Sequence, residues 1–148
     1  MKTVFKVLSL LVSALLIFSC GGKKSVNQEP TYADTLTAAD TAAAFALSDA
    51  FLTKVVSGEI DAALATVGEI DWEEGMFNPL SKEHALSMKG QYETMGIKRF
   101  ERLRSEFNSA SENILYYRVF FGGPSEIATT MAFNAITVDG NWYLAMKE

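Results

Sequence analysis

The sequence predicts an α+β domain, because its hydrophobic period changes from helical to alternating partway along the chain. Between residues 38 and 95, apolar side chains recur at three- and four-residue spacing, as on one face of a helix. Residues 113–147 are rich in β-formers and carry a two-residue turn signal, Asp139-Gly140. Helices followed by strands favour N-terminal helices packed on an antiparallel sheet.

The chain begins with a positively charged and then apolar stretch. Lys2 and Lys6 precede or border a run over residues 7–18 in which only Ser9 and Ser13 are polar. This layout is typical of an export signal. The run is shorter than the roughly 20 residues that span a bilayer, so an export signal is favoured over a transmembrane anchor.

Ile17-Phe18-Ser19-Cys20 ends this stretch, and Cys20 is the only cysteine of the chain. The segment resembles the lipobox of bacterial lipoproteins, although Phe18 is bulkier than the usual residue there. The resemblance implies that residues 1–19 are a signal peptide and that Cys20 carries acyl chains such as palmitate. It also implies a membrane anchor, with Gly21 favouring the outer membrane and a domain that faces the periplasm or the cell surface. The alternative is an ordinary secretory signal with an incidental cysteine.

Residues 20–37 are expected to be the lipidated cysteine and a flexible linker, and residues 38–148 a single α+β domain. Glycine, proline and polar residues dominate the linker, which cannot bury enough apolar area to order itself. Loss of residues 1–19 would leave 11 basic and 18 acidic side chains, a net charge of −7. An acidic chain repels phosphate backbones, so no nucleic-acid partner is expected.

Three helices are predicted, over residues 38–57, 59–67 and 80–95. Thr37 caps the first, with Asp40 placed to complete a capping box, and Gly58 ends it. Ser81 caps the third, and Gly96 ends it. The stretch between the second and third helices, residues 68–79, is expected to be an irregular acidic loop around Trp72.

Strands are predicted for the rest of the chain. Residues 97–107 suit a helix nearly as well, but a strand is favoured because Gly96 interrupts the preceding helix. Residues 113–121 are apolar on both alternating faces, which indicates a central strand covered on both sides. Two further strands around Asp139-Gly140 complete a meander.

A second resemblance rests on two segments. One is the elbow of residues 51–64, where a helix is joined at Gly58 to a short Ala-Leu helix, and the other is the closing Asp139-Gly140-Asn141-Trp142 hairpin. They are similar to the nuclear transport factor 2-like (cystatin-like) superfamily over nearly all of residues 38–148. The resemblance implies a cone, in which helices pack on a strongly bent sheet and leave a pocket at the open end. Relatives include lipoproteins of unknown function and ketosteroid isomerase-like or SnoaL-like enzymes, and the fold does not choose among them.

No catalytic, metal or cofactor site is predicted. His84 is the sole histidine, and its neighbour Glu83 points elsewhere on a helix, so a boundary position is favoured over catalysis. The acids Glu69, Asp71, Glu73 and Glu74 could supply a general base or calcium ligands, but a solvated loop is favoured. In a strand, Lys98, Arg102 and Arg104 would share a face with Phe100, favouring an exposed sheet face over a docking site for an acidic partner.

Aromatic side chains are the candidates for a pocket lining, although aromatic residues on strands more often belong to a core. The candidates are Trp72, Tyr92, Tyr116, Phe120, Phe133 and Trp142. The leading hypothesis is a non-enzymatic, membrane-anchored lipoprotein that binds a small apolar ligand or a protein partner in the cell envelope. The alternatives are an isomerase-like enzyme that transfers protons in the cone, and a structural envelope component with a filled cone.

Overall fold

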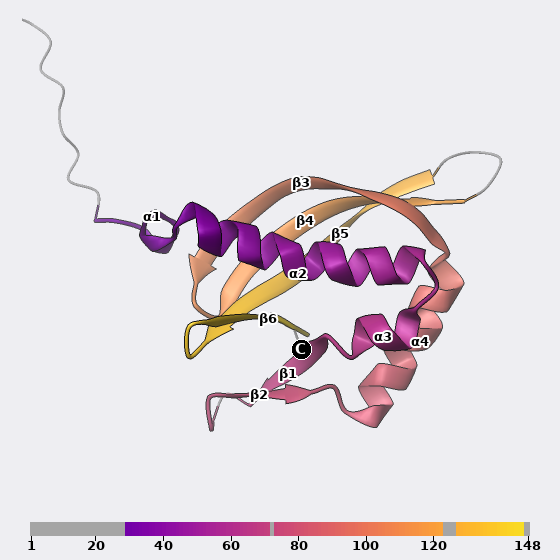
Figure 1. Ribbon diagram of the computed structural model, residues 1–148, viewed down its shortest axis with the longest axis horizontal. Helices are drawn as coiled ribbons and strands as arrows, with labels where there is room; N and C mark the ends of the chain where they lie inside the picture. Colours follow the sequence, from indigo (N-terminus) through magenta and orange to yellow (C-terminus); the bar gives the residue numbers. More distant parts are fainter. Residues whose placement is uncertain (1–28, 72, 123–126, 147–148) are drawn as a thin grey trace, which may run out of the picture.

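The computed structural model describes residues 29–71, 73–122 and 127–146, and in these ranges the chain is a mixed α+β fold (Figure 1). The signal segment, Cys20 and Trp72 lie outside the described residues. The helices are α1 (Tyr32–Thr35), α2 (Ala38–Val56), α3 (Ile60–Leu64) and α4 (Lys82–Met95). The strands are β1 (Val67–Asp71), β2 (Met76–Pro79), β3 (Ile97–Ser109), β4 (Glu112–Phe121), β5 (Ile127–Val138) and β6 (Asn141–Ala145).

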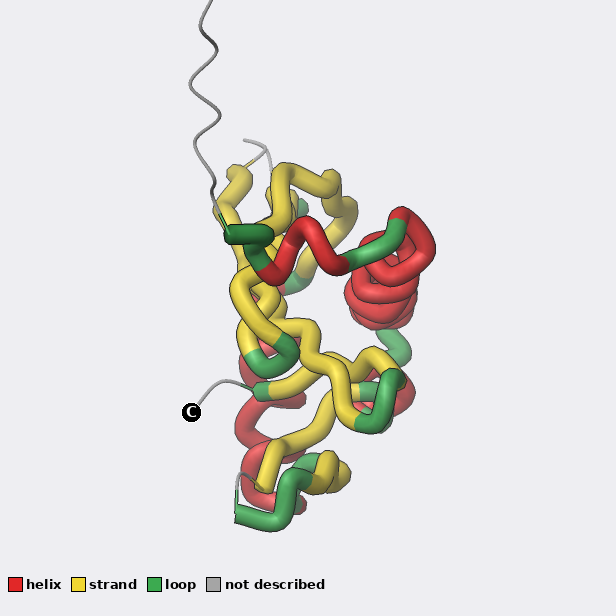
Figure 2. The backbone as a smooth tube through the Cα atoms, turned by 90° about the vertical axis from the view of Figure 1, so that its left-hand side faces the viewer, coloured by secondary structure: helices red, strands yellow, loops and turns green. Residues whose placement is uncertain are grey.

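All six strands form one sheet in the order β2-β1-β6-β5-β4-β3, and α2 crosses one face of it (Figures 1 and 2). Neighbouring strands are antiparallel except β1 and β6, which pair in parallel over two residues. The α+β prediction is confirmed. No helix among the described residues has both the length and the apolar character needed to cross a bilayer.

The predicted helix boundaries are largely confirmed, because local signals set them. Thr37 accepts from the backbone N–H of Asp40 at 3.2 Å, while its own N–H donates to the Asp40 carboxylate at 2.8 Å. Gly58 and Gly96 have φ of 82° and 58°, the left-handed conformation that ends a helix. The second helix is shorter than expected, because β1 already begins at Val67.

The expected loop over residues 68–79 is wrong: among the described residues of this range, Gly68–Asp71 pair with Met76–Pro79 as the β1–β2 hairpin. Gly68 allows the close pairing, since a Cβ there would lie 2.2 Å from the carbonyl oxygen of Asn78. Asp71 orders the turn by accepting from the N–H groups of Glu73 and Glu74 at 2.9 and 3.1 Å. The predicted linker also contains one helical turn, α1.

Strands β3, β4 and β5 are the long strands of the sheet, and the strand prediction for residues 97–107 is confirmed. The expectation that β4 is covered on both sides is wrong. Its inward residues Leu115, Tyr117 and Val119 are fully buried, whereas Arg118 on the outer face is exposed. Phe120 owes its burial on that face to the guanidinium of Arg99, 3.3 Å above its ring centre.

Aromatic rings that meet edge to face form the centre of the core between α2 and the sheet. Phe51 of α2 packs on Tyr92 of α4 and on Phe133 of β5, at centroid distances of 5.2 and 5.4 Å. Tyr117 meets Phe133 at 5.7 Å. Each such pair contributes about 0.5–1.5 kcal/mol beyond its buried area, so this cluster fixes how the helices sit on the sheet.

Candidate functional site

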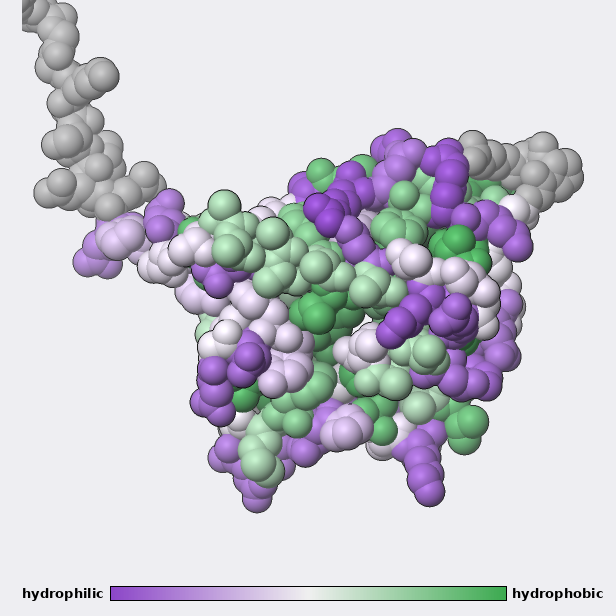
Figure 3. Space-filling view, in the orientation of Figure 1, coloured by the Kyte–Doolittle hydropathy of each residue, from purple (hydrophilic) through white to green (hydrophobic). Residues whose placement is uncertain are grey.

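A cavity of about 210 Å³ lies where β6 ends, between the sheet and α4. Its walls come from five elements: Phe51 of α2, Val67 of β1, Met88 and Tyr92 of α4, Ala132, Phe133 and Asn134 of β5, and Leu144 and Ala145 of β6, with Met146. The face drawn in Figure 3 is hollowed below α2, and apolar side chains gather around the hollow. The volume suits a ring-sized apolar group, since a cavity of about 150 Å³ accepts benzene.

Tyr92 gives this cavity its distinctive polar group. Burial raises the pKa of Tyr92 to about 12, so the hydroxyl keeps its proton. Among the described residues, no side chain or backbone group forms a hydrogen bond with that hydroxyl. The other polar side chain in the lining, Asn134, is occupied by the N–H of Asn113 at 3.0 Å and the carbonyl of Ser111 at 3.3 Å. The phenol is therefore available to a ligand.

The remaining aromatic candidates lie elsewhere. Tyr116 and Phe120 are on the outer face of β4, where Arg104 and Arg99 cover their rings, so they do not line the cavity. Trp142 packs edge to face on Phe107, at 6.2 Å between centroids, outside the cavity lining. Of the five candidates that the structure describes, Tyr92 and Phe133 are the two brought together there, and Trp72 lies outside the described residues.

The predicted shared face of Lys98, Arg102 and Arg104 is also wrong. The register between β3 and β4 shifts between Arg102 and Arg104, which places Arg102 opposite buried Tyr117 and Arg104 opposite Tyr116. A bulge inserts one extra residue and so reverses the alternation that follows. Arg102 thus reaches α2, while Arg104 stays on the outer face.

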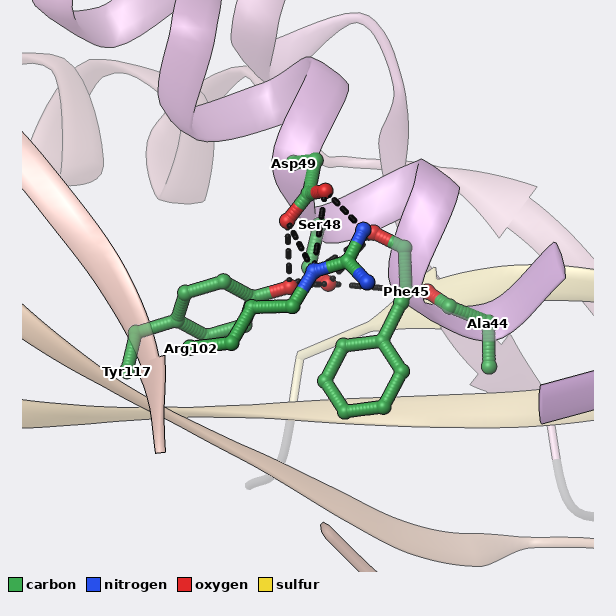
Figure 4. Close-up of polar contacts among 6 residues, drawn as sticks. All are labelled: Ala44, Phe45, Ser48, Asp49, Arg102 and Tyr117. Atoms are coloured by element: carbon green, nitrogen blue, oxygen red, sulfur yellow. Dashed lines mark hydrogen bonds and ion pairs between the residues drawn. The ribbon is translucent and has the colours of Figure 1, made fainter. Parts of the chain in front are cut away.

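Arg102 belongs to a polar network that sequence reasoning missed (Figure 4). Its guanidinium donates from Nε to both carboxylate oxygens of Asp49, at 3.1 and 3.0 Å, and from Nη2 to Oδ2. The hydroxyl of Tyr117 donates to Asp49 at 2.7 Å and shares a second 2.7 Å hydrogen bond with Ser48. These contacts tie α2 to β3 and β4.

The charges of this network are fixed by its hydrogen bonds. Burial raises the pKa of Asp49, but the hydrogen bonds from Arg102 and Tyr117 outweigh it and hold that pKa below its usual range. Burial, partly opposed by Ser48, raises the pKa of Tyr117. Asp49 therefore stays ionised with its oxygens engaged, which suits a structural ion pair better than a general base.

Glu69 and His84 form a second pair that local sequence could not reveal. The imidazole Nδ1 lies 2.7 Å from the Glu69 carboxylate, which also accepts from the N–H of Ser81 at 3.1 Å. The hydrogen bond with His84 is the main reason that the pKa of Glu69 is lowered. This pair joins β1 to the start of α4. Neither side chain lines the cavity.

A wider, more open groove of about 450 Å³ runs between α3 and α4. Leu64, Leu80 and Ala85 contribute to its apolar floor, and the ion pair between Lys89 and Asp61, 2.7 Å long, stands at its rim. Because Lys89 and Asp61 already pair with each other, the groove is a weaker candidate for a ligand-binding site than the cavity. No cluster of three metal-ligating side chains occurs in the described part of the chain.

Comparison with known proteins leaves the family open. No family model matches the chain, and no curated protein matches it. One similar solved structure is a crystal structure of a protein named as an NTF2-like transpeptidase from Campylobacter jejuni, at 15% identity and a TM-score of 0.40. That likeness covers 68% of this chain and 95% of the other.

Proposed function

We propose that this chain is an exported lipoprotein, anchored through Cys20 to a bacterial membrane, whose domain is a non-enzymatic binding module of the nuclear transport factor 2-like type. The order of the elements supports the cone, because α2, α3 and α4 precede three long antiparallel strands and a closing hairpin. Its ligand is a small apolar molecule, or an apolar group of a protein partner in the envelope.

The observation that carries the binding role is an apolar cavity lined in part by Tyr92, whose hydroxyl has no hydrogen-bond partner among the described residues. Among the described lining side chains, the carboxylates and imidazole that proton transfer would require are absent. One hydrogen-bond donor among apolar walls instead favours a ring-sized ligand with one acceptor atom. The volume of about 210 Å³ is below the roughly 300–1,000 Å³ of pockets for drug-sized molecules.

Calorimetry with benzaldehyde and toluene as probes tests this role. Both should bind, and Tyr92→Phe should weaken benzaldehyde by about three- to tenfold while leaving toluene unchanged, since only benzaldehyde accepts the hydrogen bond. Tyr116→Phe, on the outer face, is the matched control and should change neither. If neither probe binds the wild-type chain, the cavity is not a binding site.

The anchor has its own test in the cells that produce the protein. The full chain should incorporate radiolabelled palmitate and fractionate with membranes, whereas Cys20→Ala should do neither, since it removes the acylated thiol. Cys20→Ser serves as a second variant, because it replaces the thiol with a hydroxyl group of similar size. Continued labelling of both variants would show that the lipid is attached elsewhere or that the resemblance is misleading.

A further inference from the structure

The sheet protects its two outer edges but leaves one internal stretch open. Edge strand β3 carries three register shifts and a series of exposed charges that includes Arg99, Glu101 and Glu106. The other edge strand, β2, is four residues long and ends at Pro79. Bulges, charges, short length and proline are the devices by which sheets avoid pairing with foreign strands.

Strand β5 lacks these devices. It pairs with β4 along residues 127–135, but with β6 only from Asn134 onward. Within the described residues, 127–133 therefore have no strand on their second side. All twelve residues of β5 are uncharged, and Ile127 is 64% exposed. An uncharged, exposed strand edge of seven residues is a template for another strand.

The register shows which backbone groups this edge presents. Asp139 and Gly140 have φ of 49° and 78°, a type I′ hairpin, so Val138 and Asn141 form a hydrogen-bonded pair. Alternation then directs the N–H and C=O groups of residues 138, 136 and 134 toward β6. The backbone N–H and C=O groups of Ala128, Thr130 and Ala132 face the same side of β5, and all three residues are exposed. Three donor–acceptor pairs thus face outward where β6 no longer covers β5.

The cavity borders this same stretch. Its lining includes Ala132 and Phe133 of the open edge, together with Met88 and Tyr92 of α4. A strand lying along Ala128–Ala132 would have alternate side chains directed toward the cavity, because strand side chains alternate between faces. The cavity accepts one ring-sized group, which matches a single apolar side chain.

We propose that the open edge of β5 captures an extended segment of a partner protein, which adds to the sheet beside Ala128, Thr130 and Ala132 and inserts one apolar side chain into the cavity that Tyr92 and Phe133 line. The segment is uncharged where it pairs, since β5 offers no charge to neutralise one. This inference rests on the proposed binding role of the cavity and specifies its partner.

Selection from a phage-displayed library of random decapeptides, against the full chain in detergent, tests the proposal. Enriched peptides should alternate β-branched or aromatic residues with polar ones and carry a central apolar residue. A bound peptide should slow amide hydrogen exchange at Thr130 and Ala132 by at least about tenfold. Failure to enrich any peptide, or protection at other amides only, would overturn the proposal.

Two variants separate backbone pairing from side-chain contact. Thr130→Pro removes an N–H that faces the open edge and spares the ladder to β4, so it should weaken the selected peptide about tenfold or more. Thr130→Ala keeps the N–H and should bind within about twofold of the wild type. Equal binding to both folded variants would refute strand addition.

N-methylated peptides decide the matter if Thr130→Pro does not fold. Methylation of alternate peptide amides that face β5 should abolish binding, and methylation of the intervening amides should not. Equal tolerance of both patterns would contradict the proposal.

Concentration-dependent dimerisation that protects the Thr130 and Ala132 amides without peptide would show that a second copy occupies the edge. Binding of toluene without any selected peptide would overturn this inference alone, whereas loss of both would overturn the binding role as well.

Discussion

Replacing Tyr117 by phenylalanine tests whether the polar network holds α2 on the sheet. Tyr117 is fully buried, and its hydroxyl is the one atom removed. That hydroxyl lies 2.7 Å from an oxygen of Asp49 and 2.7 Å from Oγ of Ser48. The ring keeps its edge-to-face contacts with Phe45 and Phe133, so the substitution isolates the hydrogen bonds.

The expected loss follows from these two contacts. A hydrogen bond to a charged group contributes about 1.5–3 kcal/mol, and a neutral one about 0.5–1.5 kcal/mol. Ser48 retains the carbonyl of Phe45 at 3.2 Å, and Asp49 retains Arg102, so neither is stranded. The free energy of unfolding should therefore fall by about 2–3 kcal/mol, and the melting temperature by roughly 10 °C.

Urea unfolding followed by tryptophan fluorescence and by circular dichroism measures the loss, and the m-value should stay unchanged. Tyr116→Phe is the matched control one residue away. Its hydroxyl makes a single 3.3 Å contact with exposed Glu106, so its loss should cost less than about 0.5 kcal/mol. Equal losses for the two variants would refute the claim that the network holds α2 in place.

Two further predictions follow from the same structure. Gly68→Ala should destabilise the domain by about 1–3 kcal/mol, because the new Cβ would overlap the carbonyl oxygen of Asn78. Gly90→Ala should stabilise it by about 0.5–1 kcal/mol, because Gly90 lies in α4 with open space around it. Thermal unfolding should therefore shift the melting temperature in opposite directions for the two variants. For Asp49, the folded pKa is below the unfolded value of about 3.9, so its stabilisation is complete above that pH and is lost as the pH falls through the folded pKa. The stability difference between the wild type and Asp49→Asn should thus shrink in urea titrations below about pH 4; a difference that stays constant would contradict the assignment.

Elements closed by local chemistry could be predicted from the sequence. The capping box of Thr37 and Asp40, the terminating Gly58 and Gly96, and the Asp139-Gly140 turn each involve residues within a few positions of one another. The β1–β2 hairpin could not, because its acidic residues and Gly68 are typical of loops. Its strand β1 joins the sheet by pairing with β6, and the paired residues Val67 and Leu144 lie 77 positions apart (144 − 67) in the sequence.

The candidate site divides in the same way. Tyr92 and Phe133 could be nominated because they are aromatic, but the same reasoning nominated Tyr116 and Phe120, which lie on the outer face of β4. The sequence of β4 does not show which of its two faces points toward the core. That face is determined by the packing of α2 on the sheet. Asp49 could not be identified from the sequence, because its partners lie more than 50 residues away. The bulge near Arg102 could not be predicted either, because the alternation of polar and apolar residues does not reveal it.

The proposed anchor and the proposed strand addition together predict that tether length sets how well the domain captures a partner in the same membrane. A flexible chain of about 11 residues, the number between Cys20 and α1, would have a root-mean-square span of roughly 17–20 Å. Inserting 30 glycine and serine residues after Gly22 should lower the effective concentration about sevenfold, because it falls as the −3/2 power of length. Vesicles that carry the anchored chain and a lipid-linked selected peptide would report this by energy transfer.

The same peptide free in solution is the control, since its affinity should not depend on the tether. A sevenfold change in both measurements would mean that the insertion disturbs the domain. No change in either measurement would contradict the prediction that tether length sets the effective concentration. A loss confined to the vesicle measurement is the expected result, because the hydrogen bonds of the short edge and one buried side chain supply only a few kcal/mol on their own, and anchoring both partners to one membrane raises their effective concentration.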